Sequence, residues 1–176
     1  MTEPSPPPAS GDAILIVDDE KNIRRTLRMV LEGEGYVVHE ASSAAEAQAV
    51  IAKDPVELIL LDVKLGEDNG IEVLRGLKAR GDDGVGGPAA DVPVVMISGH
   101  ATIEDAVAAT RLGAFDFMEK PLDRNRVMVT VGNALERRRM WREVNQLRRA
   151  VDARWELLGG SSVMNDLRRQ IVKVAP

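Results

Sequence analysis

The sequence predicts an α/β protein with a doubly wound, five-stranded parallel sheet and an extended C-terminal helical linker. Short apolar runs alternate with segments of helical periodicity through residues 12–137, which is the pattern of consecutive βαβ units. The clearest runs are continuously apolar, as is typical of strands buried on both faces of a sheet. Crossovers between parallel strands are almost always right-handed, so the helices are expected to cover both faces.

Five segments carry the signal of a strand. They are Ala13–Val17, Tyr36–Val38, Leu58–Leu61, Val92–Ile97 and Phe115–Met118. In a sheet of this kind, ligands bind at the carboxyl ends of the strands. The residues that follow these five segments are therefore the first candidates for a functional site.

The segments between the strands have helical spacing. Helices are expected over residues 20–33, 43–53, about 71–77 and 102–112, and from Asp123 onward. Ser43 and Asp123 are the expected N-caps, and Glu46 is placed to complete a capping box with Ser43. One face of the fourth helix is expected to carry Ala106, Val107 and Ala109.

The composition excludes several classes of protein. The 176 residues include no cysteine and two histidines, so disulfides, zinc–thiolate sites, thiol nucleophiles and histidine-rich metal sites are excluded. No apolar run is long enough for a membrane span, and the N-terminus lacks the pattern of a signal peptide. These absences predict a cytoplasmic protein with no membrane contact.

The charge is divided unequally along the chain. Residues 1–122 carry a net charge of −11, whereas residues 123–176 carry +6. We expect a disordered, proline-rich leader over 1–11, a globular domain over 12–137 and a coiled-coil-like helical linker over 138–158. A glycine-rich segment at 81–91 is expected to be a neutral surface loop, since it lacks the lysine of a phosphate-binding loop.

Acidic residues gather where the first and third strands end. Asp18, Asp19 and Glu20 follow the first strand, and Asp62 follows the third. Like charges at one edge of the sheet are costly unless a cation is present. Capping of the first helix explains Asp19 alone, whereas Mg²⁺, which binds one or two carboxylates, explains the cluster.

The fourth and fifth strands bring a hydroxyl and an ammonium group to the same edge. Ser98 ends the fourth strand, and Lys120 follows the fifth. A divalent cation, a lysine and a hydroxyl that converge on a carboxylate form a site for phosphoryl transfer, because the cations neutralise the transferring group. The carboxylate would act as the nucleophile and form an acyl phosphate.

Four segments resemble the receiver domain of two-component response regulators, with a likeness that covers residues 12–137. The segments are Ile-Leu-Ile-Val-Asp18-Asp19-Glu20, Leu-Ile-Leu-Leu-Asp62, Val-Met-Ile-Ser98-Gly-His100-Ala and Gly-Ala-Phe115-Asp-Phe117-Met-Glu-Lys120-Pro121. The resemblance implies a flavodoxin-like sheet in the order 2-1-3-4-5.

The resemblance also implies a role for each matching residue. Asp62 would be the phosphoacceptor, and Asp18 and Asp19 would hold Mg²⁺ together with Asp62 and the backbone carbonyl of Lys64. Ser98 and Lys120 would contact the phosphoryl group. The residues that complete the set are Phe117, at the position of the switch aromatic, and Pro121, in a cis bond with Lys120.

Two features depart from the family pattern. Gly66 stands where a proline is usual, although Gly70 keeps the expected spacing, and the loop at 81–91 is longer than usual. Lys64 and His100 flank the site at positions that, in this family, tune how fast the acyl phosphate hydrolyses.

The helical linker carries a heptad-like seam. Its apolar positions are Met140, Val144, Leu147, Val151 and Leu158. A parallel helical dimer is the favoured interpretation; packing on its own domain and binding of DNA are the alternatives. The arginines around the seam are interleaved with acids, and no base-reading module is visible, so no nucleic-acid contact is expected.

Residues 159–176 resemble the opening helix of the AAA+ ATPase domain in NtrC-type, sigma-54-dependent activators. The resemblance implies a phospho-accepting switch that is not an enzyme. A sensor histidine kinase would phosphorylate it, and it would dimerise through its fourth helix, fifth strand and last helix, through the linker, or through both. An aspartyl-nucleophile phosphatase, with Lys64 against it, a flavin binder and a phosphorylation-independent dimerisation scaffold are the alternatives.

Overall fold

We describe the chain from a computed structural model, in which residues 11–79, 89–100 and 102–159 are described. Nearly all of the expected leader, most of the glycine-rich loop and the ATPase-like segment from residue 160 lie outside the described residues. The chain divides into two units, Met1–Arg138 and Arg139–Pro176.

The first unit is built on a parallel sheet of five strands. The strands are β1 (Ala13–Val17), β2 (Val37–Ala41), β3 (Leu58–Asp62), β6 (Val94–Ser98) and β7 (Asp116–Glu119). Their order in the sheet is β2-β1-β3-β6-β7, and every pair is parallel. This is the 2-1-3-4-5 order of the flavodoxin-like fold, so the predicted fold class is confirmed.

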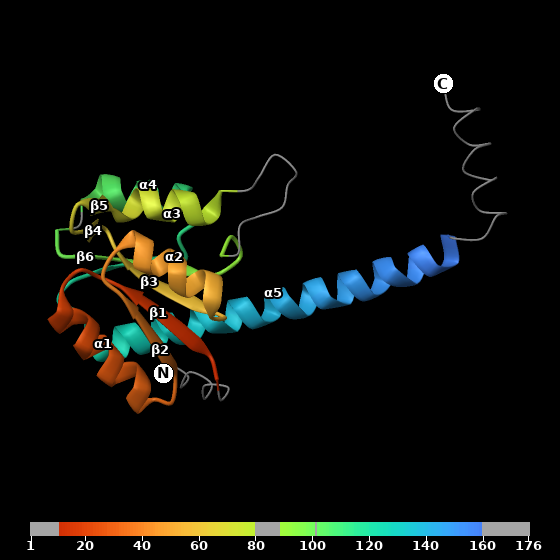
Figure 1. Ribbon diagram of the computed structural model, residues 1–176, viewed down its shortest axis with the longest axis horizontal. Helices are drawn as coiled ribbons and strands as arrows, with labels where there is room; N and C mark the ends of the chain where they lie inside the picture. Colours follow the sequence, from red (N-terminus) through yellow and green to blue (C-terminus); the bar gives the residue numbers. More distant parts are fainter. Residues whose placement is uncertain (1–10, 80–88, 101, 160–176) are drawn as a thin grey trace, which may run out of the picture. The chain divides into compact units, whose positions relative to one another are not determined.

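Helices cover both faces of the sheet, as Figure 1 shows. They are α1 (Lys21–Gly33), α2 (Ala44–Lys53), α3 (Gly70–Lys78), α4 (Ile103–Arg111) and α5 (Arg124–Gly159). Buried residues of α2, α3 and α4 belong to the core on one face, and those of α1 and α5 belong to the core on the other.

The central strands supply side chains to both cores. In β1, Ile14 and Ile16 join the core beneath α1 and α5, whereas Leu15 and Val17 join the opposite core. All five residues of β1 and all five of β3 are buried. Burial of one such aliphatic side chain contributes about 1.5–3 kcal/mol, which is why these strands read as unbroken apolar runs.

The helix caps agree with the prediction in part. The Ser43 hydroxyl accepts a hydrogen bond from the backbone N–H of Glu46 at 3.2 Å, and the Asp123 carboxylate accepts one from Arg126 at 3.0 Å. The expected capping box at Ser43 is wrong in its second half, because the Glu46 carboxylate accepts from the N–H and hydroxyl of Ser42 instead. Thr102 and Asp105 form a complete capping box at α4.

Three further details differ from the sequence prediction. A small antiparallel hairpin, β4 (Lys64–Leu65) and β5 (Asp68–Asn69), follows β3. The edge strand β2 extends to Ala41 through polar residues, since its outer side has no strand to cover it. Val107 does not share the buried face of Ala109, because its side chain is 44% exposed.

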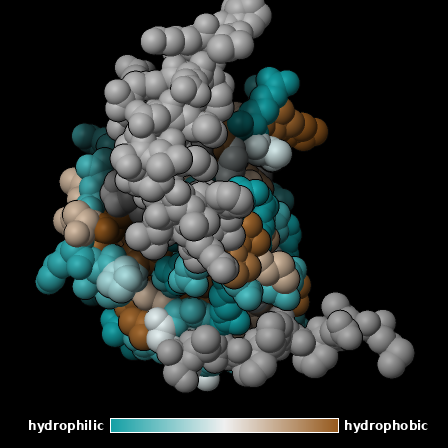
Figure 2. Space-filling view, turned by 90° about the vertical axis from the view of Figure 1, so that its right-hand side faces the viewer, coloured by the Kyte–Doolittle hydropathy of each residue, from teal (hydrophilic) through white to brown (hydrophobic). Residues whose placement is uncertain are grey.

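Helix α5 begins in the first unit and ends in the second. Its buried residues Val127, Val131, Ala134 and Leu135 belong to the core of the first unit. Within the described part of the chain, no helix is both long enough and apolar enough to cross a membrane. Figure 2 shows one face of the molecule, on which hydrophobic and hydrophilic residues are interspersed.

Candidate functional site

Asp18 is placed by the end of β1 and is almost completely buried, with 1% of its surface exposed. Its backbone N–H donates to the carbonyl of Ala41 at 3.1 Å, which continues the pairing with β2 by one residue. One carboxylate oxygen, Oδ1, accepts the N–H of Glu20 at 2.8 Å. The other oxygen, Oδ2, is left to face the neighbouring strand ends.

Asp62 is placed by the end of β3, beside β1, and is also buried. Its Oδ1 atom accepts the N–H of Lys64 at 3.2 Å. The hairpin that follows folds back over this position, since the N–H of Gly70 donates to the carbonyl of Val63 at 2.8 Å. As with Asp18, one carboxylate oxygen is bound by the local backbone and the other is available.

Lys120 joins these two carboxylates from the end of β7. Its Nζ atom lies 2.7 Å from Asp62 Oδ2, 2.9 Å from Asp18 Oδ2 and 3.0 Å from Glu20 Oε1. Its backbone N–H donates to the carbonyl of Ser98 at 2.7 Å, and its peptide bond to Pro121 is cis. Residues more than 100 positions apart in the chain therefore meet at one point on the edge of the sheet.

The charges of this cluster hold one another in place. Burial raises the pKa of Asp18 and the charge of Asp62 adds to the effect, although hydrogen bonds from Lys120 and Glu20 oppose it. Burial by itself would lower the pKa of Lys120, but its hydrogen bonds to Asp62, Asp18 and Glu20 outweigh burial and raise that pKa. Lys120 therefore stays an ammonium ion at neutral pH.

The carboxylates fit a hard divalent cation. One ligand oxygen from each of Asp18, Glu20 and Asp62 lies within 4.8 Å of the others. Oxygen ligands at this edge suit Mg²⁺, which binds through few carboxylates and keeps several water molecules. Asp19 is exposed and outside this group, and the contact that Lys64 makes to Asp62 is through its N–H.

Ser98 and Phe117 lie close to the cluster in the fold. Ser98 ends β6, is 4% exposed, and its hydroxyl accepts the N–H of His100 at 3.2 Å. Phe117 lies in β7 and is partly buried against the core beneath α2, α3 and α4. The structure thus brings Asp18, Asp62 and Lys120 into contact, with Ser98 bound to the backbone of Lys120.

The departure at Gly66 has a structural counterpart. Gly66 lies in the turn of the hairpin with a φ of +61°. Proline is restricted to φ near −65°, so it could not adopt this conformation. The glycine at this position therefore matches the shape of the turn between β4 and β5.

Gly70 is required by the close approach of two backbone segments. A Cβ atom at this position would lie 1.9 Å from the carbonyl oxygen of Asp62. Because the obstacle is backbone, no side-chain rotation relieves it. We expect Gly70→Ala to lower the free energy of unfolding by about 2 kcal/mol or more, as overpacking does. Urea denaturation would measure the loss, and Gly76→Ala, where a Cβ meets no atom within 4 Å, is the control. Equal stabilities of the two variants would contradict the expectation.

The fold and this edge of the sheet define a class of protein. Residues 14–132 match the family model for the response regulator receiver domain. The chain belongs to this family of two-component response regulators, which the sequence resemblance had indicated.

Its relatives narrow the class to regulators of transcription. The nitrogen assimilation regulatory protein NtrX of Azorhizobium caulinodans is 41% identical over 165 residues, which cover 93% of this chain and 34% of that protein. The regulatory protein AtoC of Escherichia coli is 31% identical over 92% of this chain and 34% of its own length. The chain spans about one third of the length of these relatives.

Solved structures agree with the relatives. The crystal structure of NtrX from Brucella abortus in complex with ADP is 38% identical, with a TM-score of 0.70, and the match covers 94% of this chain and 34% of that one. The receiver domain of the same Brucella protein is also 38% identical, with a TM-score of 0.63 over 70% of this chain and 98% of that domain.

Proposed function

We propose that this chain is the phospho-accepting switch of an NtrX-like response regulator, phosphorylated on Asp62 by a sensor histidine kinase. One observation carries the proposal: two buried carboxylates, Asp18 and Asp62, share the ammonium group of Lys120 at the edge of the sheet. Burial of these charges is costly, and a scaffold without chemistry has no need of them.

The transfer of the phosphoryl group uses the free oxygen of Asp62. An oxygen of the carboxylate forms a bond to phosphorus while the phosphorus–nitrogen bond of the kinase's phosphohistidine breaks. The histidine nitrogen keeps the electron pair and takes up a proton from solvent. Lys120 is already 2.7 Å from Asp62 and stabilises the negative charge of the incoming oxygens.

The cation site deepens this proposal. Bound Mg²⁺ would supply further neutralisation of the phosphoryl oxygens. Asp18 and Asp62 would hold it, with Glu20 close enough to contribute. Ligation by Asp19 and by the backbone carbonyl of Lys64 stays a prediction, as does the cytoplasmic location.

Phosphorylation would act on the neighbouring strand ends. The phosphoryl group adds about −1.5 to −2 units of charge beside Lys120 and draws the Ser98 hydroxyl toward it. Since the N–H of Lys120 is bonded to the carbonyl of Ser98, movement at one strand end affects the other. The change would bias Phe117 and the face of α4, β7 and α5 toward a second arrangement.

The direct test of this function is the intact mass of the 176-residue chain after incubation with acetyl phosphate. We expect a gain of one phosphoryl group that requires Mg²⁺. No gain, followed by tight binding of beryllofluoride, would indicate rapid hydrolysis. No gain and no beryllofluoride binding would contradict the proposal and favour the scaffold, and repeated turnover of small phosphate esters would favour the phosphatase.

The readout in this proposal is a homodimer that controls an ATPase and DNA-binding output in the longer protein. The described part of the linker seam, at Met140, Val144 and Leu147, is exposed at 57%, 47% and 63% of the surface of each residue. Apolar side chains with heptad spacing are suited to a second copy of the same helix.

We expect Leu147→Glu to weaken the dimer, because it would place charges of the same sign across the seam. Analytical ultracentrifugation would show a raised monomer fraction at a concentration where the unchanged chain is dimeric. Gln146→Glu introduces the same charge at the adjacent exposed position and is the control. A dimer that tolerates Leu147→Glu as well as the control would exclude the linker from the interface.

A further inference from the structure

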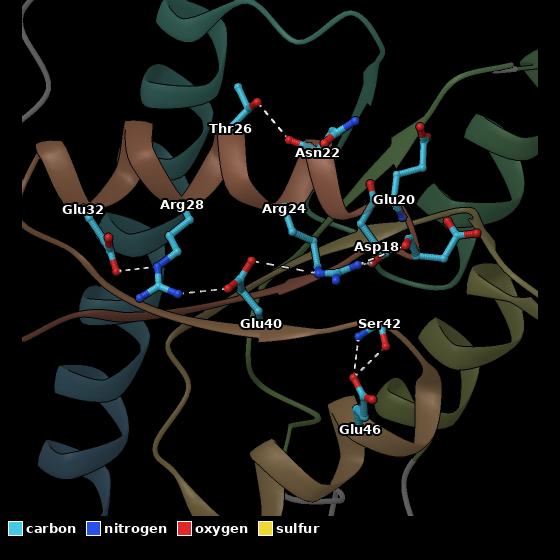
Figure 3. Close-up of polar contacts among 11 residues, drawn as sticks. Asp18, Glu20, Asn22, Arg24, Thr26, Arg28, Glu32, Glu40, Ser42 and Glu46 are labelled. Carbon is cyan, nitrogen blue, oxygen red and sulfur yellow. Dashed lines mark hydrogen bonds and ion pairs between the residues drawn. The ribbon is translucent and has the colours of Figure 1, made fainter.

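The turn between β1 and α1 is held by an arginine from the helix that follows it. Arg24 lies in α1, and its side chain is 15% exposed. Its Nη1 atom donates to the backbone carbonyl of Asp18 at 2.6 Å and to that of Asp19 at 3.0 Å. One guanidinium group thus binds two successive carbonyl groups of the acidic turn, as Figure 3 shows for Asp18 and Arg24.

These two hydrogen bonds fix the backbone on which the cluster depends. A strand that leaves its sheet exposes carbonyl groups that need new donors. The N–H of Asp18 is still bound by β2, its side chain is bound by Glu20 and Lys120, and its carbonyl is bound by Arg24. Arg24 is therefore the contact that fixes the peptide plane directly after Asp18.

Arg24 is in turn positioned by the edge of the sheet. Glu40 in β2 has one carboxylate oxygen 3.9 Å from Nε of Arg24 and the other 3.0 Å from Nη1 of Arg28. Arg28 also pairs with Glu32 at 2.8 Å, so two arginines of α1 are tied to one acidic residue of β2 (Figure 3). This arrangement restricts the guanidinium group of Arg24 to the position that reaches the turn.

We propose that Arg24 is a positioning residue for the cation site, and that it strengthens Mg²⁺ binding by holding the turn that carries Asp18. The proposal rests on the proposed function, because the receiver site is what requires the cation. The sign of the effect makes it distinctive: a nearby positive charge, acting through space alone, would weaken the binding of Mg²⁺. Residues that orient metal ligands typically change affinity by about 10- to 100-fold.

The test is the dissociation constant of Mg²⁺, measured by isothermal titration calorimetry on the 176-residue chain without any phosphoryl donor. We expect Arg24→Met to weaken binding by about tenfold. Arg24→Lys keeps the charge but lacks the planar group that reaches both carbonyls, so we expect an intermediate loss. Arg25→Met removes the same charge at the adjacent exposed position and should leave the affinity unchanged.

Each outcome has a distinct meaning. Tighter binding in Arg24→Met would show that the arginine acts as a charge alone, and unchanged binding with a lower melting temperature would show a purely structural role; either result overturns the proposal. If Arg24→Met fails to fold, an unchanged affinity in Arg24→Lys overturns it. Absence of Mg²⁺ binding in the unchanged chain overturns it as well. A chain that binds Mg²⁺ with the expected pattern but takes up no phosphoryl group would contradict the proposed function and leave this inference standing.

Discussion

Asp62→Asn is expected to abolish phosphoryl uptake from acetyl phosphate while the fold is retained. The side-chain amide keeps the shape of the carboxylate but lacks the anionic oxygen that attacks phosphorus. Lys120 would still be paired with Asp18 and Glu20, so its charge would not be left without a partner. The intact mass would show no phosphorylated species, and the circular dichroism spectrum would match that of the unchanged chain.

A matched control separates the site from the general loss of an acid. Asp68 in β5 has an exposed carboxylate that accepts the N–H of Ala44 at 3.2 Å, a bond that an asparagine oxygen can also accept. Asp68→Asn should therefore be phosphorylated to the same extent as the unchanged chain. Normal uptake by Asp62→Asn would place the phosphoryl group elsewhere and would remove the basis of the proposed mechanism.

Lys120→Met is the second substitution with a large expected effect. It removes the common cation of Asp18, Glu20 and Asp62, so three carboxylates are left to repel one another. We expect some phosphorylation to persist with Mg²⁺, since the nucleophile is intact. We also expect the response to phosphorylation to be lost, because no ammonium group would link the phosphoryl oxygens to the end of β7.

The measurement is the oligomeric state with and without beryllofluoride, by light scattering coupled to size-exclusion chromatography. The unchanged chain should change its dimer population when beryllofluoride binds, and Lys120→Met should bind it without that change. Lys21→Met, which removes the same charge from an exposed residue at the start of α1, is the control. A normal response in Lys120→Met would contradict the role of the lysine in the switch.

The same variant has a predictable dependence on pH. Burial already raises the pKa of Asp18, and loss of Lys120 removes a contact that opposes this rise. A carboxyl group whose pKa is higher in the folded state binds more protons there than in the unfolded chain, so stability falls as the pH rises. Urea denaturation should therefore show a larger loss for Lys120→Met, relative to the unchanged chain, above pH 6 than near pH 4. A loss that grows toward low pH would contradict this.

The strands and the site edge were predictable because they follow from burial and topology. The unbroken apolar runs of β1 and β3 are buried on both faces, and the ends of parallel strands meet at one edge. That rule alone brings Asp18, Asp62 and Lys120 together from distant parts of the sequence.

Other features depend on contacts that a linear pattern does not contain. The hairpin of β4 and β5 consists of two-residue strands, too short for a periodic signal. Arg24 and Arg25 are adjacent arginines, and only packing against β2 decides which one reaches the turn. Val107 was placed on the wrong face because a fourth helix rich in alanine has a weak apolar stripe.

The central claim is that Asp62 itself carries the phosphoryl group, and chemical trapping of the acyl phosphate tests it most directly. Borohydride reduces an acyl phosphate of aspartate to homoserine. After treatment with acetyl phosphate, Mg²⁺ and borohydride, peptide mass spectrometry should find homoserine at position 62 and unchanged aspartate at positions 18 and 19. Homoserine at another acidic residue, with aspartate retained at 62, would contradict the account.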